Sequence, residues 1–322
     1  MDIACCTDHK YLKYCITMLL SFFDHHREEE VCVHLLANSL RPEEEQKVRD
    51  VVEKFCARIE VYPVDGDFLS SLTQGQYSYI TPTTYARLFL SEVLPTDVEK
   101  VIYLDCDLIV LDSLVPLWTC SLEKEYELAV VEDSCSANPC YYERLHISNC
   151  HRYFNAGVLL VDLSAWRERK FVELALDLLN TSKLQLDYAD QDVLNVLCEG
   201  RVKYLPFRFN LQEAMLRRYV PEIGDDARRK IVESLSSPAV IHFTYLLKPW
   251  SYTSFHPYRE HFYYYFDQTE WCGERPVPTW KERMQRFMWW GASMVKMVNI
   301  YHPLPAQMKM DRWMCTRQPL HK

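Results

Sequence analysis

Glycine is scarce in this sequence, and the phosphate-binding loops that depend on it are missing. The 322 residues include 7 glycines, where average composition would give roughly 22. The patterns G-x-G-x-x-G and G-x-x-x-x-G-K-[ST] do not occur, which excludes the dinucleotide fingerprint and the P-loop. If the chain binds phosphate groups, charge must hold them.

Long apolar runs and paired cysteines are also missing. No apolar run approaches the roughly 18 residues that span a bilayer, so we expect a soluble or peripheral protein. No signal peptide opens the sequence, and we expect its 13 scattered cysteines to be reduced thiols in a cytosol. No C-x-x-C pair occurs, and Cys135 with Cys140 comes nearest to zinc-ligand spacing, which leaves zinc a weak alternative.

Charge is distributed unevenly along the chain. The net charge is -9, which argues against general nucleic-acid binding. From Trp271 onward there are nine Lys and Arg against three acidic residues, so this tail carries +6 and the remainder carries -15. We expect the two parts to face different partners.

Residues 1 to about 247 alternate short apolar segments with amphipathic ones, the pattern of an α/β domain with a mostly parallel sheet. The expected strands are 3–6, 31–36, 59–64, 101–104, 128–131, 158–161 and 239–243. The expected helices are 12–23, a charged helix opened by Pro42, 83–92, 165–179 and 190–198. The first repeat of strand and helix, which the strand 59–64 closes, resembles one half of a nucleotide-binding unit.

Two carboxylates follow the apolar segment 101–104. Asp105 and Asp107 lie two residues apart at the expected strand end, so both point to one face and Cys106 points away. In parallel α/β sheets, ligands collect at the carboxyl ends of strands. Buried carboxylates need a counter-charge, so this pair predicts a site for a hard cation.

A histidine and a lysine from a distant segment are further candidates. His242 lies in the expected strand 239–243, and taken alone it is more often a hydrogen-bonded core residue than a ligand. Carboxylates joined by an imidazole suit Mn²⁺ better than Mg²⁺. Such an ion neutralises a leaving diphosphate, and Lys248 adds a cationic contact to the same phosphates.

Several motifs in one order give the chain a family resemblance from residue 1 to about 250. It resembles the retaining glycosyltransferases of family eight, which include bacterial lipo-oligosaccharide galactosyltransferases and glycogenin. The resemblance implies a nucleotide-diphospho-sugar transferase (GT-A-like) fold with a mixed, mostly parallel sheet. The motifs are Met1-Asp2-Ile3 with Asp8 and Tyr11, Thr83-Thr84-Tyr85-Ala86-Arg87-Leu88, Tyr103-Leu104-Asp105-Cys106-Asp107, Asp112-Ser113-Leu114 with Pro116-Leu117-Trp118, Tyr153-Phe154-Asn155-Ala156-Gly157-Val158, Asp190-Gln191-Asp192, and His242 with Lys248-Pro249-Trp250.

The resemblance implies a role for each matching position. Its metal ligands are Asp105, Asp107 and His242. Its donor-binding residues are Asp8 at the uracil or ribose end of UDP, Arg87, Asn155 and Gly157 along the sugar, Asp105, and Lys248 at the diphosphate. Asp190 and Gln191 stand beside the reacting sugar as the catalytic pair, with Asp190 bonding its hydroxyls and Gln191 close to the face of the sugar opposite the leaving group. Read without the family, Arg87, Asn155 and Asp190 are ordinary salt-bridging, turn and helix-start residues.

The implied reaction moves galactose or glucose from a UDP-sugar to a glycan or lipid-linked acceptor with retained configuration. An amide oxygen is a poor nucleophile, so Gln191 is expected to give electrostatic support. The chain departs from the family at Tyr245, where relatives have glycine, and at Lys10 and Tyr79. A tyrosine in place of that glycine changes how closely backbone approaches phosphate.

The C-terminal segment 251–322 is expected to be helical, basic and rich in aromatics, beside a catalytic unit 1–250. In residues 280–301 the apolar positions Trp280, Met284, Phe287, Met288, Gly291, Met294, Val295 and Val298 recur at helical spacing. Such a helix either lies in an anionic membrane surface, at the cytoplasmic face, or docks on the catalytic unit. The aromatic cluster 255–271 is more often core than a stacking surface for acceptor sugars.

Two other functions fit the D-x-D pattern. An aspartyl-phosphate phosphatase would use Asp105 as nucleophile and Asp107 as acid, although that motif usually lies near the N-terminus and continues with Thr or Val where this chain has Ile109. A non-catalytic UDP-sugar-binding scaffold is favoured if Tyr245 blocks the diphosphate. No motif separates galactose from glucose or identifies the acceptor, the linkage or the oligomeric state.

Overall fold

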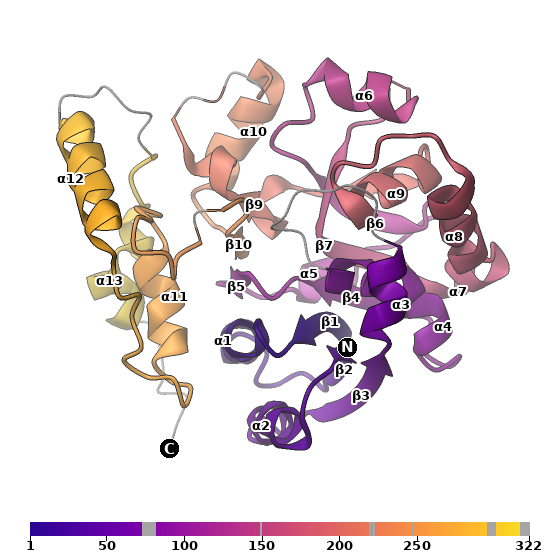
Figure 1. The fold of residues 1–322 in the computed structure, drawn as a ribbon, viewed down its shortest axis with the longest axis horizontal. Helices are drawn as coiled ribbons and strands as arrows, with labels where there is room; N and C mark the ends of the chain where they lie inside the picture. Colours follow the sequence, from indigo (N-terminus) through magenta and orange to yellow (C-terminus); the bar gives the residue numbers. More distant parts are fainter. Residues whose placement is uncertain are drawn as a thin grey trace.

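A seven-stranded mixed sheet forms the centre of the fold (Figure 1), in the order β3-β2-β1-β4-β7-β6-β8. The computed structural model describes residues 1–72, 82–148, 150–218, 220, 223–246, 248–294 and 301–315. Pairs β1–β2, β2–β3, β1–β4 and β6–β8 are parallel, whereas β7 runs antiparallel to β4 and β6. The strands are β1 (Asp2–Asp8), β2 (Cys32–Asn38), β3 (Arg58–Val64), β4 (Lys100–Leu104), β6 (Leu128–Glu132), β7 (Phe154–Asp162) and β8 (Val202–Tyr204).

A second, three-stranded sheet continues from the first. Strand β5 (Leu108–Val110) starts four residues after β4 ends and pairs antiparallel with β10 (Val240–His242), which also pairs with β9 (Leu211–Gln212). In this register His242 lies opposite Leu108, and the amide of Phe243 donates to the carbonyl of Asp107 at 2.9 Å. The small sheet therefore brings a segment from late in the chain to the carboxyl end of β4.

Alternating residues of the strands enter two cores, one on each face of the large sheet. Ile3 and Cys5 join the core that includes α1 (Leu12–Asp24), while Ala4 and Cys6 join the core on the opposite face. This period of two is what a strand buried on both faces requires. Helix α2 (Pro42–Glu53) lies on the α1 face; the other face is covered by η1 (Pro82–Phe89), α3 (Gly66–Ser71), α4 (Leu90–Val93), α6 (Pro139–Leu145), α7 (Leu163–Glu168), α8 (Phe171–Thr181) and α9 (Ala189–Leu197).

The expected strands are all present, but two expected helices differ. The helix expected at 165–179 is two helices, α7 and α8, because Lys170 adopts φ +55° between them and the buried rings of Trp166 and Phe171 stack at 3.9 Å across the break. The segment expected as a helix at 83–92 is largely 3₁₀ (η1). Because residues three apart eclipse in a 3₁₀ helix, Thr84 and Arg87 lie on one side.

The C-terminal segment consists of α11 (Arg259–Phe266), α12 (Trp280–Met294) and α13 (Met310–Cys315). Most of its aromatic cluster is core, as expected: Tyr258, Phe262 and Tyr265 are at most 1% exposed and join the core that contains α1, whereas Phe255 is exposed. Helix α12 lies at the outer edge of the molecule (Figure 1), and of the helix expected at 280–301, residues 295–300 lie outside the described part. The expected division of the chain at residue 250 stays a prediction.

The structure also bears on membrane-spanning helices and on the cysteines. Within the described ranges, no helix combines the length and apolar character needed to cross a membrane. The 12 cysteines whose side chains are described are free thiols. The remaining short elements are α5 (Val115–Trp118), η2 (Phe207–Phe209), η3 (Glu213–Leu216), α10 (Asp225–Ser234) and η4 (Ala306–Met308).

Candidate active site

A cleft of about 330 Å³ opens at the carboxyl end of β1 and β4. Every predicted catalytic, donor-binding and metal-binding residue lines it, although these residues come from separate segments of the chain. Parallel strands deliver their carboxyl ends to one edge of a sheet, so this is the place where an α/β fold collects ligand-binding groups. The predicted site residues in the cleft are Asp8, Arg87, Asp105, Asp107, Asn155, Gly157, Asp190, Gln191, His242 and Lys248.

The three predicted metal ligands converge within the cleft. Asp105, Asp107 and His242 each offer one ligand atom, and these atoms lie within 4.8 Å of one another. Nε2 of His242 is 3.1 Å from Oδ1 of Asp107 and 3.8 Å from Oδ2 of Asp105. Two carboxylates and an imidazole form a donor set that fits a divalent cation such as Mn²⁺.

A buried amide orients the imidazole. Nδ1 of His242 lies 3.0 Å from Oδ1 of Asn210, and Nδ2 of Asn210 donates to Oδ1 of Asn155 at 2.9 Å. Because the oxygen of Asn210 can only accept, Nδ1 carries the proton and Nε2 keeps its lone pair. That is the tautomer in which Nε2 can bind a metal.

Lys248 reaches the same carboxylate from the other side. Its Nζ lies 2.5 Å from Oδ2 of Asp107 and also donates to the carbonyl of Phe243. Burial would raise the pKa of Asp107, but the charge of Lys248, together with the contact of His242, outweighs burial and holds this pKa well below its usual range. Asp107 is therefore ionised and ready to serve as a ligand.

Arg87 connects the metal-binding carboxylate to the predicted catalytic one. Its Nη2 lies 2.8 Å from Oδ1 of Asp105 and its Nε lies 2.9 Å from Oδ2 of Asp190. Its Nη1 donates to the carbonyl of Ala156 at 2.6 Å, and its guanidinium lies over the ring of Tyr103. Arg87 is 4% exposed, so it is a buried bridge rather than a solvated surface residue.

Asp190 is buried at the start of α9. Burial raises the pKa of its carboxyl to about 6, although Arg87 opposes that shift. Its Oδ2 is close to Arg87, yet among the described residues no donor is aligned to hydrogen bond with this atom. The preceding Ala189 has φ +52°, a strained conformation for a residue with a Cβ. Strain of this kind, and a buried carboxylate oxygen that has an ion pair but no aligned hydrogen bond, are typical of functional sites.

Gln191 is held by hydrogen bonds on both ends of its amide. Its Oε1 accepts from Nδ2 of Asn155 and from the amide of Ala156, both at 3.1 Å. Its Nε2 donates to the hydroxyl of Tyr153 at 3.2 Å. With its oxygen already engaged by two donors, this amide is fixed in orientation and is a poor nucleophile.

The backbone of Gly157 packs directly against the imidazole of His242. A Cβ at this position would lie 2.1 Å from Cε1 of His242 and 2.9 Å from Oδ2 of Asp105. Only a residue without a side chain leaves room for both ligands. Gly157 thus lies against two of the predicted metal ligands, and its expected contact with the donor sugar stays a prediction.

Asp8 and Tyr245 lie at other positions along the cleft. Asp8 ends β1, and its carboxylate accepts from the amide of Tyr11 at 2.9 Å. Tyr245 adopts φ +63°, the left-handed region that favours glycine, so the backbone at this position keeps the conformation that a glycine would supply. Its hydroxyl lies 3.2 Å from Sγ of Cys135. Lys10 is exposed, and Tyr79 lies outside the described residues.

Two polar residues of the site were missed. Asp133 directly follows β6, is buried, and has a pKa raised by burial. Its Oδ2 lies 3.4 Å from both Asn155 and Gln191. The rule that identified Asp105, a carboxylate directly after a buried strand, would also have found Asp133. Asn210 follows the short η2 turn and carries no comparable signal.

Comparisons with known proteins agree with this arrangement. A family model described as "Glycosyl transferase family 8" matches residues 2–254. General stress protein A of Bacillus subtilis is 27% identical over 278 residues, covering 84% of this chain and 94% of that protein. Lipopolysaccharide 1,2-glucosyltransferase of Escherichia coli K12 is 26% identical over 277 residues, covering 86% of this chain and 80% of that protein.

A solved structure gives the same result for the fold. The galactosyltransferase LgtC, crystallised with donor and acceptor sugar analogues, superimposes with a TM-score of 0.76 at 27% identity, covering 88% of this chain and all of that one. The expected GT-A-like fold is thereby confirmed. The match of the family model over most of the chain shows that this protein belongs to glycosyltransferase family 8 and is a sugar-transferring enzyme.

Proposed function

We propose that this glycosyltransferase moves a hexose, galactose or glucose, from a UDP-sugar to a glycan or lipid-linked acceptor in lipopolysaccharide or polysaccharide synthesis. The transfer depends on Mn²⁺, or less well on Mg²⁺, and retains the anomeric configuration. The similar proteins named as a galactosyltransferase and a lipopolysaccharide glucosyltransferase support the hexose and the acceptor class.

The observation that carries the proposal is the convergence of Asp105, Asp107 and His242, with Lys248 beside them, at the edge of the sheet. When bound by these three residues, a divalent cation would neutralise the developing charge on a diphosphate leaving group. Lys248 Nζ already binds Oδ2 of Asp107, so a short movement of this flexible side chain presents its charge to the same phosphates.

The remaining side chains position the sugar. Arg87 fixes Asp105 and Asp190 relative to each other through its ion pairs. The carboxylate at the diphosphate and the carboxylate at the sugar therefore stay at a constant distance from each other. The carboxylate of Asp190 accepts a hydroxyl of the donor sugar. Gln191, held by Asn155, supports the positive charge that develops on the sugar without a covalent bond. A stable glycosyl adduct on Gln191, sought by mass spectrometry, would contradict this role.

The decisive experiment is a UDP-release screen over several UDP-sugars with Mn²⁺. We expect release from UDP-galactose or UDP-glucose, and a loss of about 100-fold or more in Asp107→Ala, because charge stabilisation by a cation contributes several kcal/mol. Asp177→Ala, which removes an exposed carboxylate from α8, is the matched control. Release that is unaffected by Asp107→Ala would remove the cation from the mechanism.

The alternative functions give different results in binding experiments. A scaffold would bind UDP with Mn²⁺ in calorimetry but turn over no UDP-sugar, and a phosphatase would not bind UDP. The phosphatase is disfavoured by family membership, and also because Oδ1 of Asp105 already accepts from Arg87 and Tyr103.

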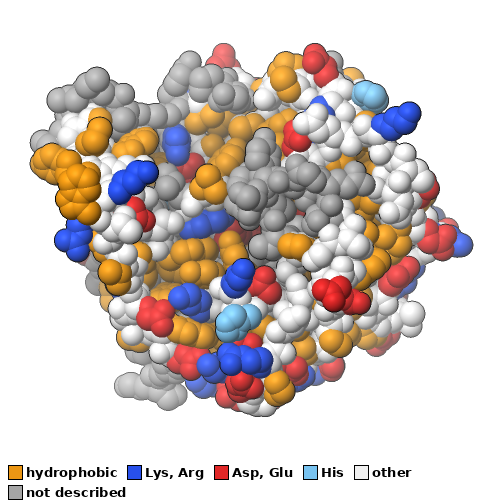
Figure 2. Space-filling view, in the orientation of Figure 1, with side chains coloured by type: hydrophobic (Ala, Val, Ile, Leu, Met, Phe, Trp, Pro, Cys, Tyr) orange, Lys and Arg blue, Asp and Glu red, His pale blue; other side chains and the backbone are white. Residues whose placement is uncertain are grey.

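We also propose that α12 attaches the enzyme peripherally to the cytoplasmic face of an anionic membrane. This helix exposes several large apolar side chains that Figure 2 shows at the edge of the molecule, with basic side chains among them. The exposed apolar residues are Trp280 (77%), Met284 (42%), Phe287 (64%), Met288 (67%), Trp289 (43%) and Trp290 (52%). An exposed apolar patch bordered by Lys and Arg suits an anionic lipid surface.

Vesicle sedimentation tests this attachment. We expect the full chain to pellet with anionic vesicles and less with neutral ones, and Phe287→Ser with Met288→Ser to reduce pelleting several-fold. Val232→Ser, which removes an exposed apolar residue from α10, is the matched control. Equal pelleting of the double variant and the wild type would count against attachment through α12.

The net negative charge of the chain does not support nucleic acid as a partner.

A further inference from the structure

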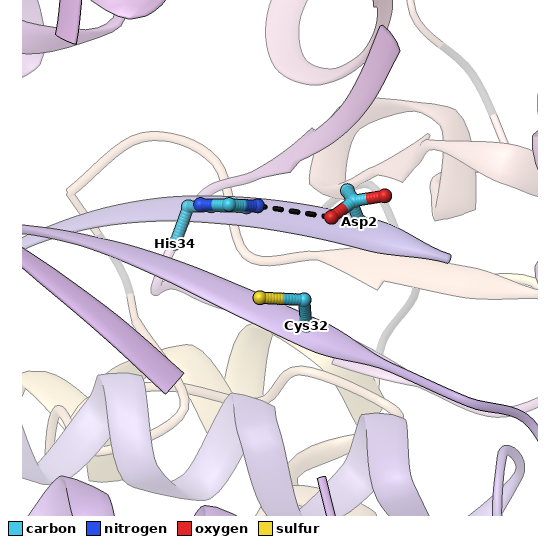
Figure 3. A group of neighbouring side chains, drawn as sticks. All are labelled: Asp2, Cys32 and His34. Atoms are coloured by element: carbon cyan, nitrogen blue, oxygen red, sulfur yellow. Dashed lines mark hydrogen bonds and ion pairs between the residues drawn. The ribbon is translucent and has the colours of Figure 1, made fainter. Parts of the chain in front are cut away.

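A second group of metal-ligand side chains lies away from the sugar cleft (Figure 3). Asp2 starts β1, Cys32 starts the neighbouring β2, and His34 lies two residues further along β2. The parallel register places Asp2 beside Cys32, and a strand period of two puts Cys32 and His34 on the same face. One oxygen, one sulfur and one nitrogen from these residues lie within 4.8 Å of one another.

We propose that Asp2, Cys32 and His34 form a zinc-binding site. Thiolate, imidazole and carboxylate are the ligands that Zn²⁺ takes, and the hard cations Mg²⁺ and Ca²⁺ avoid sulfur. Nε2 of His34 lies 3.0 Å from Oδ1 of Asp2, and Figure 3 shows the sulfur of Cys32 turned toward the imidazole. Three protein ligands leave the fourth tetrahedral position to water.

The surroundings of His34 fix the position and orientation of its ring. His34 is 1% exposed and Cys32 is 6% exposed, so both side chains are held in place by the core. Nδ1 of His34 lies 3.0 Å from the hydroxyl of Tyr62 on β3. When Nδ1 donates to that oxygen, the lone pair of Nε2 points toward Asp2, and a hydrogen bond of this kind orients and strengthens a histidine ligand.

The site is open to solvent on one side. The side chain of Asp2 is 27% exposed, so an ion and its water can reach the site from the surface. Cys32 and His34 close the site on the side of the core. A buried thiol and imidazole beside a half-exposed carboxylate is a different arrangement from the exposed acidic clusters that are common on protein surfaces.

The position of this site predicts its effect. Asp2 and Cys32 occupy the amino ends of β1 and β2, whereas the sugar cleft lies at the carboxyl ends. At about 3.3 Å per residue, the six steps from Asp2 to Asp8 separate the two sites by roughly 20 Å. Zinc would therefore join the first two strands of the sheet and stabilise the fold, without a direct part in sugar transfer.

Cobalt titration of the full-length, chelator-treated and reduced protein tests the site. Co²⁺ substitutes for Zn²⁺ and gives an ultraviolet thiolate-to-cobalt absorption only when sulfur is a ligand, so the carboxylate and imidazole ligands of the cleft stay silent. We expect one equivalent of this absorption in the wild type, in Asp107→Ala and in Cys150→Ser, and its loss in Cys32→Ser. Cys150 is an exposed thiol outside the group and is the matched control. No absorption in the wild type, or equal absorption in Cys32→Ser, would overturn the proposal.

Stability and affinity give independent evidence. Zn²⁺ should raise the Tm of the wild type and of Asp107→Ala by several degrees and leave the Tm of Cys32→Ser unchanged. Tyr62→Phe keeps all three ligands and removes only the oxygen that orients His34, so zinc affinity should fall about 10- to 100-fold. With Mn²⁺ present, Cys32→Ser should transfer sugar at the wild-type rate. An equal Tm rise in Cys32→Ser would assign the stabilisation to another site.

Discussion

Nδ1 of His242 faces the side-chain oxygen of Asn210 at 3.0 Å, and this contact decides which ring nitrogen is available to a metal. The amide also bonds Asn155, so it cannot rotate without breaking a second hydrogen bond. Asn210 is 0% exposed and His242 is 3% exposed. The orientation of the histidine is thus built into the core of the protein before any ion arrives.

Replacing Asn210 should weaken metal binding without removing a ligand. In Asn210→Ala the imidazole loses its acceptor, and we expect Mn²⁺ affinity to fall about 10- to 100-fold, with transfer recovered at high Mn²⁺. Titration of activity against Mn²⁺ measures the change. Asn138→Ala, which removes only the side-chain cap of α6, should titrate like the wild type. A normal Mn²⁺ dependence in Asn210→Ala would show that the amide does not orient the ligand.

Gly157→Ala should disrupt the same site by crowding. The added Cβ would lie 2.1 Å from Cε1 of His242 and 2.9 Å from Oδ2 of Asp105, so at least one ligand must move. We expect a loss of about 1–3 kcal/mol in the free energy of unfolding and a more than tenfold loss of Mn²⁺ affinity. Denaturant unfolding and Mn²⁺ titration measure the two effects. Gly224→Ala, with no atom within 4 Å of the new Cβ, should change neither by much.

The convergence at the cleft could be predicted in part. Asp105 and Asp107 were identifiable because a buried apolar strand precedes them and side chains alternate along a strand. Their partner His242 depends on β5, which has only three residues and starts directly after Asp107. A strand that short gives no periodic signal, so pairing of β5 with β10 could be known only from the fold or from the family resemblance.

Other differences have tertiary causes. The break between α7 and α8 occurs at Lys170, with neither glycine nor proline to mark it, because packing of Trp166 on Phe171 determines the local backbone. The zinc-ligand group could not be found either, since Asp2 and Cys32 are 30 residues apart and meet only through the register of β1 and β2. Periodicity predicts elements, whereas contacts between short elements require their arrangement.

Tyr245 occupies a backbone conformation suited to glycine, and a comparison of two variants isolates that strain. Tyr245→Gly and Tyr245→Ala both lose the ring, but only alanine keeps a Cβ at φ +63°. We expect the glycine variant to be more stable by about 1 kcal/mol, measured by denaturant unfolding. We also expect tighter UDP binding in Tyr245→Gly, by calorimetry with Mn²⁺, because the backbone can then approach the diphosphate. Tyr245→Phe keeps the ring and the strain and loses only the hydroxyl, which contacts Cys135, so it should bind UDP like the wild type.

Asp190 should affect activity and stability in opposite directions as pH changes. Burial raises the pKa of this carboxyl from 3.8 to about 6, so the folded protein holds the proton more tightly than the unfolded chain. The resulting stability is present below pH 3.8 and is lost as pH rises through about 6. In contrast, a carboxylate that accepts a sugar hydroxyl must be ionised, so kcat/KM should rise over the same range. A cation at Asp105 and Asp107 would move the midpoint of activity to lower pH.

Asp190→Asn separates the two effects. This variant should lose most activity at every pH, and the difference between its unfolding free energy and that of the wild type should change between pH 4 and pH 7. Asp177→Asn, an exposed carboxylate on α8, should show neither change. A wild-type kcat/KM that is flat from pH 5 to pH 8, with unchanged stability differences, would mean that Asp190 stays ionised throughout. In that case the charge of Arg87, which lies 2.9 Å away, lowers the pKa of this carboxyl more than burial raises it.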